Sequence, residues 1–256
     1  MTLSGQTILV TRPVHQAGGL MKAIEQAGGK AVLLPLIEIV PVENPQMFEQ
    51  CWKSLEHYHW LVFISANAVN FAASMNGGRI DLPATLKVAA IGQATASALR
   101  QHNIAVNLLP DGGYNSEALL KAAAWQQLDG QRFLIVRGVG GREKLANTLR
   151  MRGAEVDYLE VYRRIRPNNN PEPVKKLLDR QQLSAIVLTS GEAVKNLSDI
   201  LNQANGLLST PLVVISSRIA QIATRLGFET IKVSQGPSET AIIETLMTLR
   251  NGEKSG

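Results

Sequence analysis

Short apolar segments alternate with amphipathic segments along the whole chain. The first apolar segment is Thr7–Arg12, a helical pattern follows from about residue 16 to 27, and Gly28 ends it before a second extended run at 30–39. The apolar segments are continuous rather than alternating, which is typical of strands buried on both faces. Strands of this kind separated by helices predict an α/β protein with parallel sheets covered by helices.

This pattern is an internal repeat, because residues 131–165 replay the first segment. Arg12 corresponds to Arg137, Leu20 to Leu145 and Gly28 to Gly153. Later blocks also recur: 60–65 with 185–189, 87–91 with 211–215, a strand near 105–109 with one at 229–233, and final helices entered at Asn115-Ser116-Glu117 and Pro237-Ser238-Glu239. Each copy therefore holds five short strands, for which a flavodoxin-like strand order is expected.

Two proline-rich linkers, 41–45 and 167–173, follow equivalent strands of the two copies. Their positions indicate that the chain leaves one domain and later returns to it. One domain would then hold 1–36 plus 168–256 and the other 42–160, with 37–41 and 161–167 as linker strands. Two consecutive domains that meet near residue 128 use the same repeat, and the pattern alone does not choose between the two arrangements.

Composition and charge narrow the class of protein. Apolar residues make up 45% of 256 residues and no apolar run approaches a membrane span, so a globular chain without a membrane segment is expected. The N-terminus lacks a signal-peptide pattern and Cys51 is the single cysteine, which favours the cytoplasm and excludes an internal disulfide. The net charge of +5 favours anionic partners. Nucleic acid is the weakest of these, because the basic residues are scattered and aromatics are only 5%.

The turns that follow the predicted strands hold the candidate binding residues. Ligands of open parallel sheets bind beyond the carboxyl ends of the strands, where helix N-termini attract anions. The candidates are small, hydroxyl-bearing or cationic: Arg12, Ser65, Asn67, Gly92, Gln93, Thr95, Arg137, Thr189, Ser190 and Ser217. N-capping accounts for any one of the hydroxyls equally well, but equivalent places in both copies favour a shared anion-binding face.

Conventional catalytic motifs are missing from these turns. Gly138-Val139-Gly140-Gly141 lacks the third glycine of a dinucleotide fingerprint, and no phosphate-binding loop or nucleophile elbow occurs. His57-x-His59 has no accompanying carboxylate cluster, so surface histidines explain it better than a metal site. Tyr162 lies on the extended segment that enters the second linker, where a phenol either donates a proton to a leaving oxygen or packs at a domain junction.

These motifs together resemble the uroporphyrinogen-III synthase family over essentially the whole chain. The matching stretches are Ile8–Pro13, Pro35–Ile39, Phe63–Val69, Ala90–Ala96 and Val161–Arg164, with echoes at 188–190 and 214–217. The resemblance implies two flavodoxin-like domains joined by a two-stranded linker, with the substrate hydroxymethylbilane bound in a cleft between them. It also implies loss of the substrate's terminal hydroxyl as water, inversion of ring D and closure to uroporphyrinogen III, without a metal or an organic cofactor.

The resemblance assigns two residues individually. Tyr162 matches the family tyrosine thought to assist departure of the hydroxyl, and Thr95 matches a threonine in a Gly-x-x-Thr-Ala turn that faces the cleft. The second copy departs from that turn, since Ser217-Arg218-Ile219 has neither the glycine nor the threonine. A monomer is expected, with transient contact to hydroxymethylbilane synthase. A cytosolic two-lobed binding module for a small anion is the alternative function.

Overall fold

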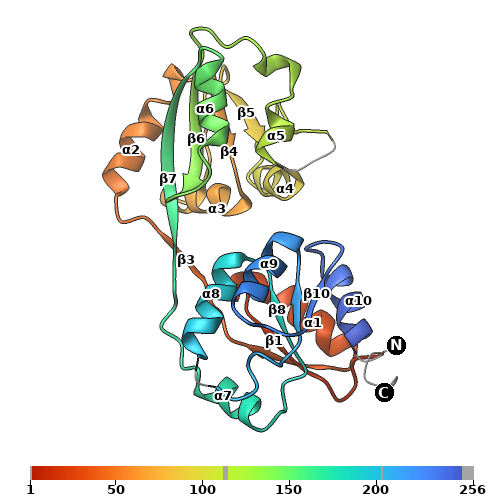
Figure 1. Ribbon diagram of the computed structural model, residues 1–256. Helices are drawn as coiled ribbons and strands as arrows, with labels where there is room; N and C mark the ends of the chain where they lie inside the picture. Colours follow the sequence, from red (N-terminus) through yellow and green to blue (C-terminus); the bar gives the residue numbers. More distant parts are fainter. Residues whose placement is uncertain (1, 112–114, 203, 250–256) are drawn as a thin grey trace. The chain divides into compact units, whose positions relative to one another are not determined.

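The computed structural model describes residues 2–111, 115–202 and 204–249 and divides into two compact units. Unit 1 comprises Met1–Glu38 with Ile165–Gly256, and unit 2 comprises Ile39–Arg164. Residues 1, 203 and 250–256 of the first expected domain, and 112–114 of the second, lie outside the described residues. The chain passes between the units twice, at 38–39 and at 164–165 (Figure 1).

Unit 1 is built on a parallel sheet of order β10-β9-β8-β1-β2. Counted along the chain within the unit, this is the flavodoxin order. Its elements are β1 (Thr7–Val10), α1 (Val14–Gln26), β2 (Lys30–Leu33), α7 (Glu172–Asp179), β8 (Ala185–Leu188), α8 (Gly191–Ile200), β9 (Leu212–Val214), α9 (Ser217–Arg225), β10 (Ile231–Val233) and α10 (Glu239–Leu249). Helices α1 and α10 pack together, as do α8 and α9. One buried cluster joins Ile8, Val187 and Val213 of the sheet to Leu20 of α1 and Leu246 of α10.

Unit 2 has a sheet of order β3-β7-β6-β4-β5. Its elements are β3 (Glu38–Pro41), α2 (Pro45–Lys53), a 3₁₀ turn (Leu55–His57), β4 (Trp60–Phe63), α3 (Ala66–Met75), β5 (Lys87–Ala90), α4 (Gln93–Gln101), α5 (Ser116–Leu119), a second 3₁₀ turn (Ala123–Trp125), β6 (Arg132–Gly138), α6 (Lys144–Met151) and β7 (Glu155–Ile165). Helices α3 and α4 pack together, and so do α5 and α6. Alternate residues of the strands serve two buried clusters, one with Leu61 and Phe63 and the other with Trp60 and Val62.

The strand pairing confirms that the chain leaves the first sheet and returns to it. Ile8 of β1 lies opposite Ala185 of β8, and Leu61 of β4 lies opposite Leu134 of β6. Each sheet therefore combines strands from both copies of the repeat. Two consecutive domains that meet near residue 128 would keep each copy in its own sheet, so that arrangement is wrong.

Three expected elements differ in the structure. The run expected at 30–39 divides into β2 and β3, because Pro35 between them has no N–H to donate to a ladder. The strand expected near 105–109 is reduced to a bridge between Ala89 and Leu108, since the Asn107 side chain takes the Val88 N–H at 2.7 Å. The helix entered at Asn115 spans only Ser116–Leu119, whereas its counterpart α10 spans Glu239–Leu249.

Candidate functional site

Ser65 and Tyr162 meet at the carboxyl edge of the unit 2 sheet. Ser65 directly precedes α3 and caps it: its Oγ accepts a hydrogen bond from the Ala68 N–H at 3.0 Å. The same oxygen lies 3.2 Å from the hydroxyl of Tyr162, which stands on β7. Capping, expected as an alternative for each hydroxyl, is therefore one role of Ser65, and its contact with the phenol is a second.

Tyr162 is held firmly by its surroundings. Its side chain is 2% exposed and stacks on Phe71 of α3 with ring centroids 5.7 Å apart, while the Arg164 guanidinium lies 5.7 Å from the ring centroid. Both alternatives from the sequence are thus represented, because the ring packs and the hydroxyl remains in a polar contact. A phenol fixed in this way is suited to donate a proton in one direction.

The turn before α4 offers backbone and hydroxyl groups. Its N-cap is Gly92, so no side chain accepts from the first N–H groups of α4, in contrast to α3. Thr95 in the first turn is 2% exposed, and its hydroxyl forms no hydrogen bond within the part of the chain that the structure describes. Gln93 is exposed beside it. Free N–H groups at a helix N-terminus attract anions, and a buried hydroxyl without a partner is a further site for a polar ligand.

Arg137 is engaged by the protein's own carboxylates. Its side chain is 4% exposed, with Nη1 2.9 Å from Glu143 and Nε 3.8 Å from Glu160. The guanidinium also lies 4.4 Å from the ring centroid of Tyr158, whose hydroxyl donates a hydrogen bond to Glu143. The bonds from Tyr158 and Arg137 lower the pKa of the Glu143 carboxyl, while burial and the bond to Glu143 raise the pKa of Tyr158. Arg137 is therefore held in a closed network.

Unit 1 carries the equivalent turns of its own sheet. Arg12, after β1, donates to the Pro237 carbonyl at 2.9 Å, and burial lowers the pKa of its guanidinium. Ser190 caps α8 by accepting from the Ala193 N–H at 3.0 Å, with the half-buried Thr189 just before it. Ser217 is exposed at the start of α9, and Ser216 provides the cap. These residues lie at the carboxyl ends of β1, β8 and β9, as their sequence positions predict.

The structure brings Ser65 and Tyr162 into contact, and it places Asn67 in the first turn of α3 and Gly92, Gln93 and Thr95 on the packed neighbour α4. Sequence reasoning missed Gly138, Phe71, Tyr158 and Glu143 as residues that support this region. Gly138 was visible only as part of a glycine-rich turn. Phe71, Tyr158 and Glu143 carry no motif at all, so no sequence signal could have found them.

Two kinds of site find no support in the described ranges. No group of three or more His, Cys, Asp or Glu side chains there is arranged to hold a metal ion. No helix formed by these residues is long and apolar enough to cross a membrane. The candidate site therefore rests on hydroxyls, a phenol and backbone N–H groups.

Two flavodoxin-like units with these groups at the carboxyl edges of their sheets define a two-domain α/β enzyme. The family model described as uroporphyrinogen-III synthase HemD matches residues 19–244, and the chain belongs to that family. It is 34% identical to uroporphyrinogen-III synthase of Escherichia coli (strain K12), over 94% of this chain and 99% of that one. The synthase of Salmonella typhimurium (strain LT2) is 32% identical over the same shares.

Solved structures agree with the fold. A mutant uroporphyrinogen III synthase from the extremely thermophilic bacterium Thermus thermophilus superposes with a TM-score of 0.61 at 17% identity and covers 96% of this chain and 99% of that one. The uroporphyrinogen-III synthetase of Helicobacter pylori 26695 also gives 0.61, at 16% identity, with 96% and 100% covered. The two parallel-sheet units are therefore the architecture of the family.

Proposed function

We propose that this chain is a uroporphyrinogen-III synthase, a cyclising lyase of tetrapyrrole biosynthesis that converts hydroxymethylbilane to uroporphyrinogen III. Family membership supports the activity. The observation that carries the site is the Tyr162 hydroxyl, fixed 3.2 Å from Ser65 Oγ at the end of a sheet where α3 and α4 begin.

Tyr162 acts in this proposal as the proton donor. The bond between the terminal carbon of the bilane and its hydroxyl oxygen breaks, and the oxygen takes the phenol proton and leaves as water. The cation that remains on ring A is attacked by the substituted carbon of ring D. Rearrangement inverts ring D, and the proton that this ring finally loses restores the phenol, so that the net change is the loss of one water.

Binding the substrate is mainly a matter of folding it correctly. The bilane carries carboxylates that suit the free N–H groups at the start of α4 and the buried Thr95 hydroxyl. We assign the same task to Gly92, Gln93 and Asn67 in unit 2, and to Arg12, Thr189, Ser190 and Ser217 in unit 1. Arg137 joins them where a substrate carboxylate replaces Glu143. Catalysis is then chiefly by positioning and by stabilisation of developing charge.

The remaining expectations belong to the same proposal. The protein acts as a monomer in the cytoplasm, needs no cofactor, and receives its unstable substrate through transient contact with hydroxymethylbilane synthase. Residues 1–36 with 168–256 and 42–160 act as the two domains, with 37–41 and 161–167 as linker strands.

Product analysis tests the activity directly. The protein is incubated with freshly made hydroxymethylbilane, the products are oxidised to porphyrins, and the isomers are resolved by chromatography. We expect the ring-D-inverted isomer to dominate, whereas heat-denatured protein should give the non-inverted isomer of spontaneous closure. The same isomer ratio with native and denatured protein would refute the proposal.

A further inference from the structure

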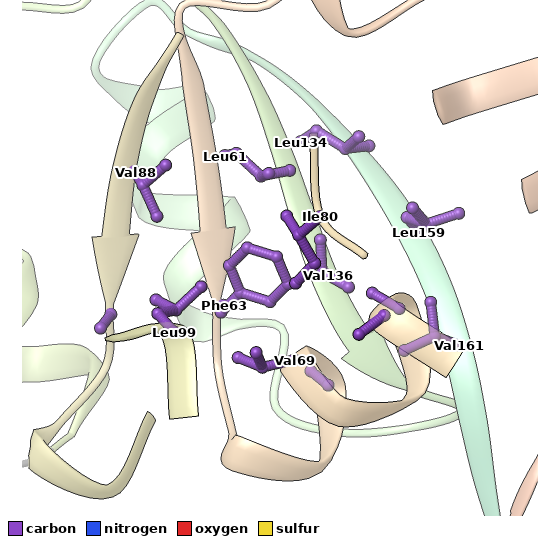
Figure 2. Close-up of a cluster of buried hydrophobic side chains, with 14 of the residues drawn as sticks. Leu61, Phe63, Val69, Ile80, Val88, Leu99, Leu134, Val136, Leu159 and Val161 are labelled. Carbon is purple, nitrogen blue, oxygen red and sulfur yellow. The ribbon is translucent and has the colours of Figure 1, made fainter. Parts of the chain in front are cut away.

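Strand β7 presents its side chains to two sides of the unit 2 sheet. Leu159 and Val161 lie in the buried cluster of α3 and α4, on the same side as Leu134 and Val136 of β6 (Figure 2). Tyr158 packs against the other cluster. Because side chains alternate along a regular strand, the residue after Val161 should return to the side of Tyr158.

Tyr162 does not follow this alternation. Arg137 of β6 lies opposite Glu160, but the next residue, Gly138, lies opposite Tyr162, so Val161 is an extra residue in the ladder. The irregularity places Tyr162 in the same cluster as Val161, against Phe71. Bulges of this kind redirect side chains next to functional sites. A regular ladder would therefore turn the phenol away from Ser65.

Gly138 provides the space into which the phenol ring turns. A Cβ at this position would lie 2.3 Å from Cε2, 2.5 Å from Cζ and 2.9 Å from Cδ2 of Tyr162. Gly138 does not adopt the left-handed backbone that favours glycine, so its backbone admits any residue. The missing side chain is consequently required by the ring of Tyr162. Alanine would push the ring, because an aromatic ring packed on Phe71 cannot bend away.

Ser65 fixes the other end of the phenol. Its Oγ already accepts from the Ala68 N–H. Its own proton is therefore available for the Tyr162 oxygen, 3.2 Å away. A phenol oxygen that accepts from Ser65 keeps its proton for a leaving group.

We infer that Gly138 and Ser65 are positioning residues for the Tyr162 phenol: the bulge and Gly138 set the ring, and Ser65 sets the hydroxyl. This inference rests on the proposed function, in which Tyr162 donates the proton. Neither residue touches the reacting atoms, and both act through Tyr162.

A double-mutant cycle with kinetics tests the coupling. Gly138→Ala and Ser65→Ala should each lower kcat about tenfold, a fraction of what a lost general acid costs, while KM changes less than twofold. In the Tyr162→Phe background neither should lower kcat further, because residues that act through one hydroxyl are not additive. Ser65→Thr, which keeps the hydroxyl, should restore kcat.

Matched controls separate positioning from general loss of structure. Ser238 accepts from the Ala241 N–H at the start of α10, so Ser238→Ala removes a similar cap outside the site. Gly18 on α1 has open space around it, so Gly18→Ala adds a methyl without a contact. Both controls should keep the kcat of the parent protein.

A fluorine spectrum reads the ring position independently of activity. In protein labelled with 3-fluorotyrosine, the Tyr162 signal is the one that Tyr162→Phe removes. Gly138→Ala should shift that signal and Gly18→Ala should not. An unmoved signal, or additive losses of kcat in the Tyr162→Phe background, would overturn the inference. Ser65→Ala and Ser65→Thr keep it open to refutation if Gly138→Ala does not fold.

The two proposals fail in different ways. If the parent protein makes no inverted isomer, the proposed function fails, while the fluorine shift still reports on Gly138. If the isomer forms normally but the Gly138→Ala signal stays in place, only the positioning inference fails.

Discussion

Replacing Tyr162 with phenylalanine should separate the role of the hydroxyl from that of the ring. The ring keeps its contact with Phe71 and its place over Gly138, and the substitution removes one hydrogen bond to Ser65. A hydrogen bond of this kind contributes about 1 kcal/mol, so Tm should fall by only roughly 2–4 °C. Loss of a general acid typically costs ~10²–10⁴-fold in rate. Because the bilane hydroxyl departs readily by itself, we expect the lower end, about 10²-fold in kcat.

The assay for Tyr162→Phe measures three quantities on one preparation. Thermal unfolding gives Tm, initial rates with hydroxymethylbilane give kcat and KM, and chromatography of the oxidised products gives the isomer ratio. Residual product should still be mainly the inverted isomer, since the helix N-termini that fold the substrate are unchanged. A variant with the parental rate and isomer ratio would show that the phenol only packs, and the reasoning on proton donation would be refuted.

Three further predictions follow from other parts of the structure. Thr95→Val should lower kcat/KM about fivefold, the effect of one lost hydrogen bond, without lowering Tm; Thr11→Val, which loses the 2.7 Å bond to the Val187 carbonyl, should lower Tm instead. Arg137→Met should destabilise unit 2 by about 1–3 kcal/mol, measured by urea unfolding, because the bonds of a buried cation to carboxylates are lost. Burial and the bond to Asp157 raise the pKa of Tyr58 from 10.0 to about 12. The stability from Tyr58 is then complete below pH 10 and lost as pH rises toward 12, so rapid absorbance titration should show one late tyrosine, absent in Tyr58→Phe.

The fold could be predicted from sequence because its signals are local and repeated. Continuous apolar runs such as Ala185–Leu188 announce strands buried on both faces, and glycines such as Gly28 and Gly153 mark helix ends in both copies. Two copies of one pattern also limit the strand order. Whether the copies exchange strands depends on contacts between distant segments, such as Ile8 with Ala185, and the pattern does not contain them.

The candidate site was predictable only in part. Strand ends and polar residues at helix starts locate Ser65 and Thr95, because these positions follow from secondary structure. The contact between Ser65 and Tyr162 depends on a bulge between β6 and β7, and no periodicity announces one extra residue in a ladder. The closed network of Arg137 depends on Tyr158 and Glu143, which the ladder and the turn after β6 bring together. Pattern reading treats Arg137 as a free cation for this reason.

The two copies of the repeat have diverged at the turns that matter for chemistry. Ser65 and Ser190 occupy equivalent places and cap their helices with the same 3.0 Å bond. The following turn differs, because Ser216 caps α9 whereas Gly92 leaves the start of α4 uncapped. A cap satisfies N–H groups that would otherwise be available to a ligand. Unit 2 thus combines the uncapped helix, the unpartnered Thr95 hydroxyl and Tyr162, so the chemistry is expected at its sheet edge.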